Sequence, residues 1–250
     1  MPILDHTSYS QINMWQRCPR QWYYRCVKGL KVPPSGALIE GSCYHTALEA
    51  NFKQKIVTME DLPVEQCLDA FSDAWEARLQ QEEIEWEDKK PGQLKDEGIK
   101  LVGAYIDTTA PQVQPIEVEK PYVREVAGVK VVSVIDLIDE DSRIIDHKTS
   151  SKAYSQDSVD KDDQLTTYAY MRNRAALCQI HVAVKPGVRT PARIQVLKTY
   201  RTGAHMEWWH QMVTEILKQM KTGVAPPRPT GWWCSPRFCG FYSRCRGMLP

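Results

Sequence analysis

The sequence predicts a mixed α/β fold: a β-sheet core flanked by helices, with a helical N-terminal region and a cysteine-rich C-terminal tail. Three observations lead to this prediction. Apolar residues recur at helical spacing through the first hundred positions, three runs rich in Val and Ile follow between residues 116 and 148, and helical and strand patterns alternate from there to residue 221. With 250 residues, 42% of them hydrophobic, the chain can bury a core without disulfide bonds.

Residues 1–115 are expected to form a mainly helical flank. Ile12, Trp15 and Trp22 are spaced for two short helices between residues 8 and 28, and Pro19 suits the first turn of the second helix. Further helices are predicted over residues 41–52, 62 to about 87 and 94 to about 106. Pro91-Gly92 is expected to end the helix that begins at residue 62.

Residues 116–222 are expected to form the α/β core of a single domain that spans the chain. The runs 116–125, 130–138 and 143–148 predict a three-stranded antiparallel meander, since turn residues separate them. A helix from about 161 to 177, strands over 180–185 and 193–199, and a helix from 203 to about 221 complete this core. The tail, residues 223–250, shows neither period, so we expect it to need a staple to be ordered.

The charge and the cysteine content limit the classes of function. A formal net charge of +1 gives no global basic field, so any contact with DNA must come from local basic patches. The sequence has neither the pattern of a signal peptide nor a run of 18 apolar residues. We therefore expect no membrane span, and we expect a cytoplasmic location. In that reducing compartment, the eight cysteines are expected to be buried thiols or metal ligands.

Two aspartates and a lysine are the strongest candidates for a catalytic site. Asp136 and Asp146 lie in successive strands across a short turn, so an antiparallel hairpin brings their carboxylates together. Lys148 leaves the same strand face as Asp146, whereas His147 points to the other face. Close carboxylates repel, and Mg2+ or Mn2+ relieves the repulsion, which indicates metal-dependent phosphodiester hydrolysis. The alternative is an exposed ion pair beside a turn.

Two helical segments extend this pattern. Residues Gly41 to His45 read G-x-x-x-H, with Glu49 one turn after the histidine, and Gln164 and Tyr168 lie at positions i and i+4. The order G-x-x-x-H, Asp, D-x-K and Q-x-x-x-Y resembles the RecB-like branch of the PD-(D/E)xK nuclease superfamily. The resemblance covers residues 41–168 and implies a restriction-endonuclease-like sheet core.

The resemblance also implies roles for individual residues. His45, Asp136 and Asp146 would bind the catalytic metal, Lys148 would act on the attacking water, and Gln164 and Tyr168 would support the site and the DNA strand. By the same resemblance the main-chain carbonyl of His147 would be a further ligand, and Glu119 looks like the acidic residue of the preceding strand. For Glu119 the alternative is an exposed strand position. Ile135 stands before Asp136 in place of Pro, and Ser133 stands where this branch often has Gly, but neither change removes a ligand.

Four cysteines predict a second metal centre. Cys234, Cys239 and Cys245 form the pattern C-x4-C-x5-C in the irregular tail, and Cys18 lies near the other end of the chain. Four thiolates could hold a 4Fe-4S cluster or a structural Zn2+ and so clamp the two ends together, or they could be free thiols. The arrangement resembles iron–sulfur-stapled RecB-like nucleases, which include AddB-type subunits and CRISPR-associated adaptation nucleases, although those more often have two residues between the first two late cysteines. Cys26 could replace Cys18; the remaining cysteines, Cys43, Cys67 and Cys178, are expected to be buried.

Basic and aromatic residues interleave near both ends of the chain. Such residues grip phosphates and stack on unpaired bases, or they pack and solvate the staple. They are Arg17, Arg20, Trp22, Tyr23, Arg25, Lys28, Arg228, Trp232, Trp233, Arg237, Arg244 and Arg246.

These features predict a metal-dependent DNA nuclease. The resemblance implies an exonuclease that acts on ends or single strands in recombination, repair or phage replication. A recombinase, helicase or single-strand-binding protein is a possible partner. The alternatives are a non-catalytic subunit that binds DNA ends and a sequence-specific endonuclease of the same superfamily.

Overall fold

One six-stranded sheet forms the centre of the protein. The computed structural model describes residues 4–86 and 89–248. The strands follow the order β1-β3-β4-β5-β6, and β2 pairs with β3. Their bounds are β1 His6–Ser8, β2 Pro115–Val126, β3 Val129–Asp139, β4 Ile144–Ser150, β5 Ala176–Val184 and β6 Arg193–Arg201.

The pairing of β3 leaves a gap at the middle of the sheet. β2 runs antiparallel to β3 along its whole length, as predicted for the first two strands of the meander. On the other side of β3, β1 pairs in parallel with residues 130–132, and β4 pairs antiparallel with Leu137 and Ile138. In the described part of the chain, residues 133–136 therefore have no strand partner on that side.

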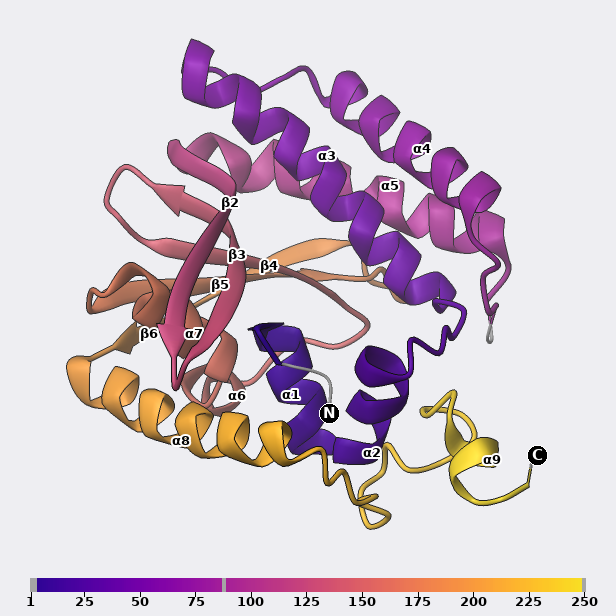
Figure 1. Ribbon diagram of the computed structural model, residues 1–250. Helices are drawn as coiled ribbons and strands as arrows, with labels where there is room; N and C mark the ends of the chain where they lie inside the picture. Colours follow the sequence, from indigo (N-terminus) through magenta and orange to yellow (C-terminus); the bar gives the residue numbers. More distant parts are fainter. Residues whose placement is uncertain (1–3, 87–88, 249–250) are drawn as a thin grey trace.

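Three long helices cover one face of the sheet (Figure 1). They are α3 Gly36–Thr58, α4 Val64–Gln81 and α5 Pro91–Thr108. The helix α3 begins after Ser35, whose hydroxyl accepts a hydrogen bond from the main-chain N–H of Leu38, as an N-cap residue does. The buried side chains of these helices pack with Leu137 of β3, Ile145 of β4 and Ala183 of β5.

Shorter helices and the long helix α8 cover the remaining surface of the sheet. The cluster around α7 Asp163–Arg172 and α6 Gln156–Asp160 packs on Ile138, Ile144 and Ile180. Helix α8 Gly203–Thr222 packs with the first helices beside the hairpin of β2 and β3 (Figure 1). These first helices are α1 Tyr9–Arg17, α2 Pro19–Trp22 and a π-helical turn over Tyr23–Val27.

The mixed α/β prediction is confirmed, but several predicted boundaries are wrong. The helix expected to reach residue 177 ends at Arg172, because Asn173 adopts a left-handed conformation with φ of 54° and caps it. The residues that follow begin β5 at Ala176, which pairs in parallel with β4. Pro91 opens α5, where proline is favoured at the first position. The preceding helix ends at Gln81, and residue 87, its predicted end, lies outside the described residues.

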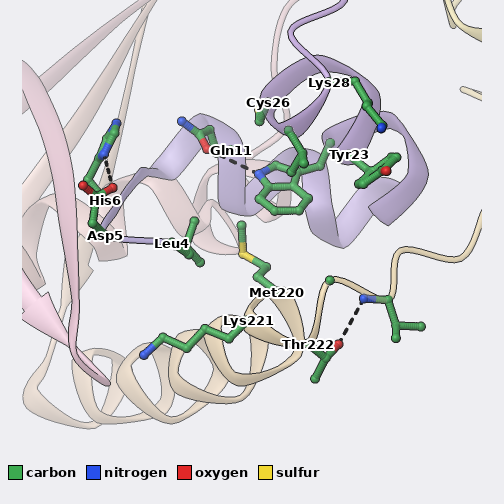
Figure 2. Close-up of a pocket in the computed structure, with 14 residues that line it drawn as sticks. Leu4, Asp5, His6, Gln11, Tyr23, Cys26, Lys28, Met220, Lys221 and Thr222 are labelled. Carbon is green, nitrogen blue, oxygen red and sulfur yellow. Dashed lines mark hydrogen bonds and ion pairs between the residues drawn. The ribbon is translucent and has the colours of Figure 1, made fainter. Parts of the chain in front are cut away.

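The tail lies against the N-terminal helices (Figure 1). It contains turns and one short helix, α9 Tyr242–Cys245. Between these helices and the end of α8 lies a cavity of about 580 Å³, which Leu4, Tyr23 and Met220 help to line (Figure 2). Cys26, the alternative to Cys18, lines this cavity, but the other predicted metal ligands do not. Within the described residues, no helix is both long and apolar enough to cross a lipid bilayer.

Candidate active site

Asp136 lies where β3 and β4 separate. Beyond the pair formed by Leu137 and Ile145, the main-chain N–H of His147 donates to Oδ2 of Asp136 at 2.8 Å, so a side chain takes the place of the next strand partner. Continuing the register places Asp136 opposite Asp146, on the side of the sheet that α7 covers. The predicted proximity of the two aspartates thus follows from the observed pairing.

Glu119 enters the same row from β2. It lies between the pairs Val118–Leu137 and Lys120–Ile135, and so opposite Asp136. Its φ of 46° is in the left-handed region, which costs a residue with a side chain about 1–3 kcal/mol. We infer that the surrounding sheet imposes this conformation, which places Oε1 of Glu119 3.6 Å from Nδ1 of His45.

His45 reaches the row from helix α3. Its Nδ1 lies 3.6 Å from Oδ2 of Asp136 as well as from Glu119. His45, Glu119 and Asp136 each offer one atom within 4.8 Å of the others, and this set is the one potential metal site of three or more ligands found among the described residues. Burial lowers the pKa of His45, but the interaction with Glu119 and the charges of Asp136 and Asp146 outweigh it and raise the pKa to about 9. We call this set the His–Glu–Asp group.

Asp146 and Lys148 belong to a network beside that group. The Nζ of Lys148 donates to Oδ1 of Asp146 at 3.1 Å and to Oε1 of Gln164 at 2.9 Å. Nε2 of Gln164 donates to the Tyr168 hydroxyl at 2.6 Å, which donates to Oδ1 of Asp146 at 3.3 Å. Helix α7 therefore supplies the two side chains that close the network. We call these four residues the lysine network.

Both aspartates are costly to keep ionised. Burial raises the pKa of Asp136 and of Asp146, with Lys148 opposing the rise in each and His45 opposing it most strongly at Asp136. Oδ2 of Asp146 lies 2.9 Å from Nζ of Lys148, but within residues 4–86 and 89–248 it has no partner with hydrogen-bond geometry. Two buried carboxylates with an oxygen left without a donor are the environment that a divalent cation stabilises.

The structure thus separates the predicted residues into two neighbouring sets. Glu119 joins His45 and Asp136, whereas Asp146 belongs with Lys148, Gln164 and Tyr168. Glu49, although on the same helix as His45, pairs with Lys53 at 2.5 Å. Sequence reasoning missed the buried contacts of the His147 side chain with Tyr105 and, through it, His181. Strand alternation puts His147 on the opposite face from Lys148, but nothing in the sequence identifies its partners there.

The four predicted cysteines line one cavity between the two ends of the chain. Cys18, Cys234, Cys239 and Cys245 contribute to it together with aromatic side chains that include Tyr24 and Phe241. Burial raises the pKa of Cys239, and the other three thiolates raise it further, so the thiols oppose one another's ionisation. The main-chain N–H of Arg228 donates to Sγ of Cys18 at 3.5 Å.

The other cysteines lie elsewhere. Cys26 is exposed and lines the cavity of Figure 2, which favours Cys18 as the fourth ligand. Cys43, Cys67 and Cys178 are buried, as predicted.

Of the basic and aromatic residues that could contact DNA, some pack or form hydrogen bonds within the protein, and others are exposed to solvent. Trp22 is 3% exposed and packs edge-on against Trp15, so of the two alternatives for this residue the structure favours packing over stacking on bases. Arg228 donates to the main-chain carbonyl of Gln16, and Nη2 of Arg246 donates to Sγ of Cys234 at 3.6 Å. Trp232, in contrast, is 69% exposed.

Two of three comparisons with known proteins found matches to this chain. Residues 6–246 match the family model described as the PD-(D/E)XK nuclease superfamily. A solved structure from Eubacterium rectale, described as a "Putative exonuclease", is 13% identical with a TM-score of 0.60 over 98% of this chain and 89% of that chain, which shows a shared fold. The structure of SSO0001 is 14% identical with a TM-score of 0.43 over 98% of this chain and 88% of that chain. Among curated proteins, none matches the chain.

Proposed function

The chain belongs to the PD-(D/E)XK nuclease superfamily, and on that premise we propose that it is a RecB-like DNA exonuclease that uses Mg2+ or Mn2+. Its place would be the processing of DNA ends or single strands in recombination, repair or phage replication. The observation that carries the proposal is the His–Glu–Asp group directly beside a lysine that is hydrogen-bonded to a second buried aspartate.

The residues of the site fit a divalent cation. Carboxylate oxygens of Glu119 and Asp136 and a ring nitrogen of His45 would hold it, with Asp146 next to them. A bound cation would neutralise charge on the phosphodiester and lower the pKa of a coordinated water. The main-chain carbonyl of His147 stays a predicted further ligand.

Lys148 is placed to act on the nucleophile. Asp146 and Gln164 fix its ammonium by hydrogen bonds, and its pKa is raised because the charges of Asp146 and Asp136 outweigh the effect of burial, so it stays protonated. A fixed ammonium orients an attacking water and stabilises the developing charge. Tyr168 holds the Gln164 amide and so supports Lys148 through one intermediate residue.

We also propose that the chain is one nuclease domain. Residues 1–115 carry His45 in α3, residues 116–222 carry the two aspartates and the lysine, and the tail joins the first helices at the cysteine cavity. The family match over residues 6–246 spans all three parts.

The cysteine cavity is proposed to hold a 4Fe-4S cluster in preference to Zn2+. Tetrahedral zinc with Zn–S bonds of about 2.3 Å brings its sulfurs to about 3.8 Å from one another. In the part of the chain that the structure describes, no three cysteine sulfurs lie within 4.8 Å of one another. A larger cluster suits this wider spacing, and it would neutralise the thiolates that oppose one another's ionisation.

Replacement of Cys239 by Ser tests the cluster. Wild-type protein purified without oxygen is expected to be brown, with visible absorbance that bleaches on oxidation, whereas the variant is colourless. The variant should also be cleaved faster by protease within the tail, since a bound metal centre stabilises the fold that holds it. Cys26→Ser, outside the cavity, is the control and should stay brown. Iron-free wild-type protein loaded with zinc would contradict the cluster.

The topology of the DNA substrate tests the exonuclease assignment. End-labelled linear DNA, single- and double-stranded, and covalently closed circular DNA are incubated with Mg2+, Mn2+ or a chelator. We expect the metals to support release of label from linear DNA and to leave circles intact. Nicked or linearised circles would identify an endonuclease, and binding of ends without cleavage would identify a non-catalytic subunit.

A further inference from the structure

Buried polar side chains form a series of hydrogen bonds that begins at His147 on β4, next to the His–Glu–Asp group, and ends at Gln179 on β5. The hydroxyl of Tyr105, on α5, lies 2.9 Å from Nε2 of His147 on β4 and 2.8 Å from Nδ1 of His181 on β5. Nε2 of His181 lies 2.8 Å from Oε1 of Gln179. None of these residues is more than 5% exposed. We call them the tyrosine–histidine chain.

Gln179, at the end of the tyrosine–histidine chain, fixes the direction of each hydrogen bond within that set of side chains. Oε1 of Gln179 only accepts, so Nε2 of His181 carries the proton. Nδ1 of His147 makes no hydrogen bond to the Asp136 carboxylate that it faces, which is the geometry of a neutral ring without a proton on Nδ1. Burial lowers the pKa of His181 to about 3, so that ring is neutral as well. Nδ1 of His181 therefore accepts from Tyr105, and the Tyr105 oxygen accepts from Nε2–H of His147.

The remaining ring nitrogen of His147 faces the candidate metal site. Its Nδ1 lies 3.9 Å from Oδ2 of Asp136, beyond hydrogen-bond length, as expected for two acceptors that face each other. That oxygen instead accepts the main-chain N–H of His147. The imidazole stacks on Phe52 with ring centroids 6.0 Å apart, and its centroid lies 6.1 Å from that of His45.

We propose that Tyr105 and His181 are positioning residues that hold His147 in its Nε2–H tautomer, so that the Nδ1 lone pair faces the His–Glu–Asp group as a further neutral acceptor. The proposal rests on the proposed metal-dependent function. The ligand that Nδ1 would take is the divalent cation or a water bound to it. Residues that orient metal-site groups through hydrogen bonds typically change metal affinity by about 10–100-fold when replaced.

Tyr105→Phe tests the proposal against a matched control. Tyr44 is fully buried like Tyr105 and packs edge-on against it with ring centroids 6.2 Å apart, but its hydroxyl has no hydrogen-bond partner among the described residues. Tyr44→Phe is therefore the same chemical change at a residue that does not belong to the tyrosine–histidine chain. Two measurements apply to both variants: the 15N spectrum of the histidine rings in the metal-free protein, and calorimetric titration with Mn2+.

In wild-type protein we expect His147 and His181 to be neutral and protonated on Nε2. Tyr105→Phe should change this pattern and weaken Mn2+ binding by about 10–100-fold, whereas Tyr44→Phe should change neither. A wild-type spectrum with the proton on Nδ1 of His147 would overturn the proposal without any variant. So would unchanged spectra and Mn2+ affinity in Tyr105→Phe.

The spectra and the titrations separate two kinds of failure. If wild-type protein neither binds Mn2+ nor cleaves DNA, the proposed function fails, and the metal-free spectrum still decides the tautomers. If wild-type protein binds Mn2+ at the His–Glu–Asp group and Tyr105→Phe binds it equally well, only the positioning role fails.

Discussion

Asp136→Asn is expected to slow metal-dependent DNA cleavage by about a thousandfold. A bound cation stabilises the charge of the transition state by several kcal/mol, and the variant loses a ligand that holds this cation. Asp136 is the carboxylate that faces His45 and accepts the His147 main-chain N–H. The amide keeps the shape of the side chain but removes the negative charge. The measurement is the rate of label release from linear DNA at saturating Mn2+.

The stability of the same variant distinguishes loss of the site from loss of the fold. Because burial raises the pKa of Asp136, its ionised form opposes folding at neutral pH. The metal-free Asn variant should therefore unfold at the same temperature as wild type or a higher one. Asp157→Asn, in an exposed ion pair with Lys161, is the control and should retain activity. Wild-type activity in Asp136→Asn would remove this residue from the mechanism.

Lys148→Met is expected to lower the rate of cleavage about 100- to 1,000-fold while metal binding persists. The ammonium is the donor to Asp146 and Gln164, and its loss removes the group that we propose to orient the nucleophile. The loss also leaves Asp146 buried without a positive partner, which should make Mn2+ binding equal to or tighter than that of wild type. The rate is therefore expected to fall without a loss of Mn2+ affinity, and titration calorimetry beside the cleavage assay measures both.

The metal should also restore the stability of Lys148→Met. Without Mn2+ this variant is expected to melt below wild type, because breaking a buried ion pair leaves one charge uncompensated, and Mn2+ should reverse part of that loss. Lys161→Met, on the surface, should change neither property. A Lys148→Met protein that loses Mn2+ binding together with activity would indicate that the lysine maintains the structure of the site.

The sheet and its two aspartates were predictable because strand alternation and turn residues are local. The runs that became β2, β3 and β4 are rich in Val and Ile, and Ala127-Gly128 supplies the two positive-φ residues of their first turn. The next turn, between β3 and β4, sets the register of Leu137 with Ile145, and continuing it places Asp136 opposite Asp146. The register of β2 with β3 places Glu119 opposite Asp136, which the sequence alone left open against an exposed position.

Other elements depend on contacts distant in sequence. The strand β1 is three residues long and exists because it pairs with residues 130–132 of β3. The start of β5 reads equally well as the end of a helix, and the left-handed Asn173 decides between them. Ser35 is a recognisable cap, but the prediction began α3 five residues later, at Gly41. The partners of His147 come from α5 and β5, so no spacing along the chain identifies them.

The measurement that tests the central claim most directly is the anomalous scattering of Mn2+ in crystals of the wild-type protein. We expect a peak bonded to His45, Glu119 and Asp136, and its absence from crystals of Asp136→Asn grown in the same way. A protein that cleaves DNA with Mn2+ while the ion binds elsewhere in the chain would contradict the assignment of this site.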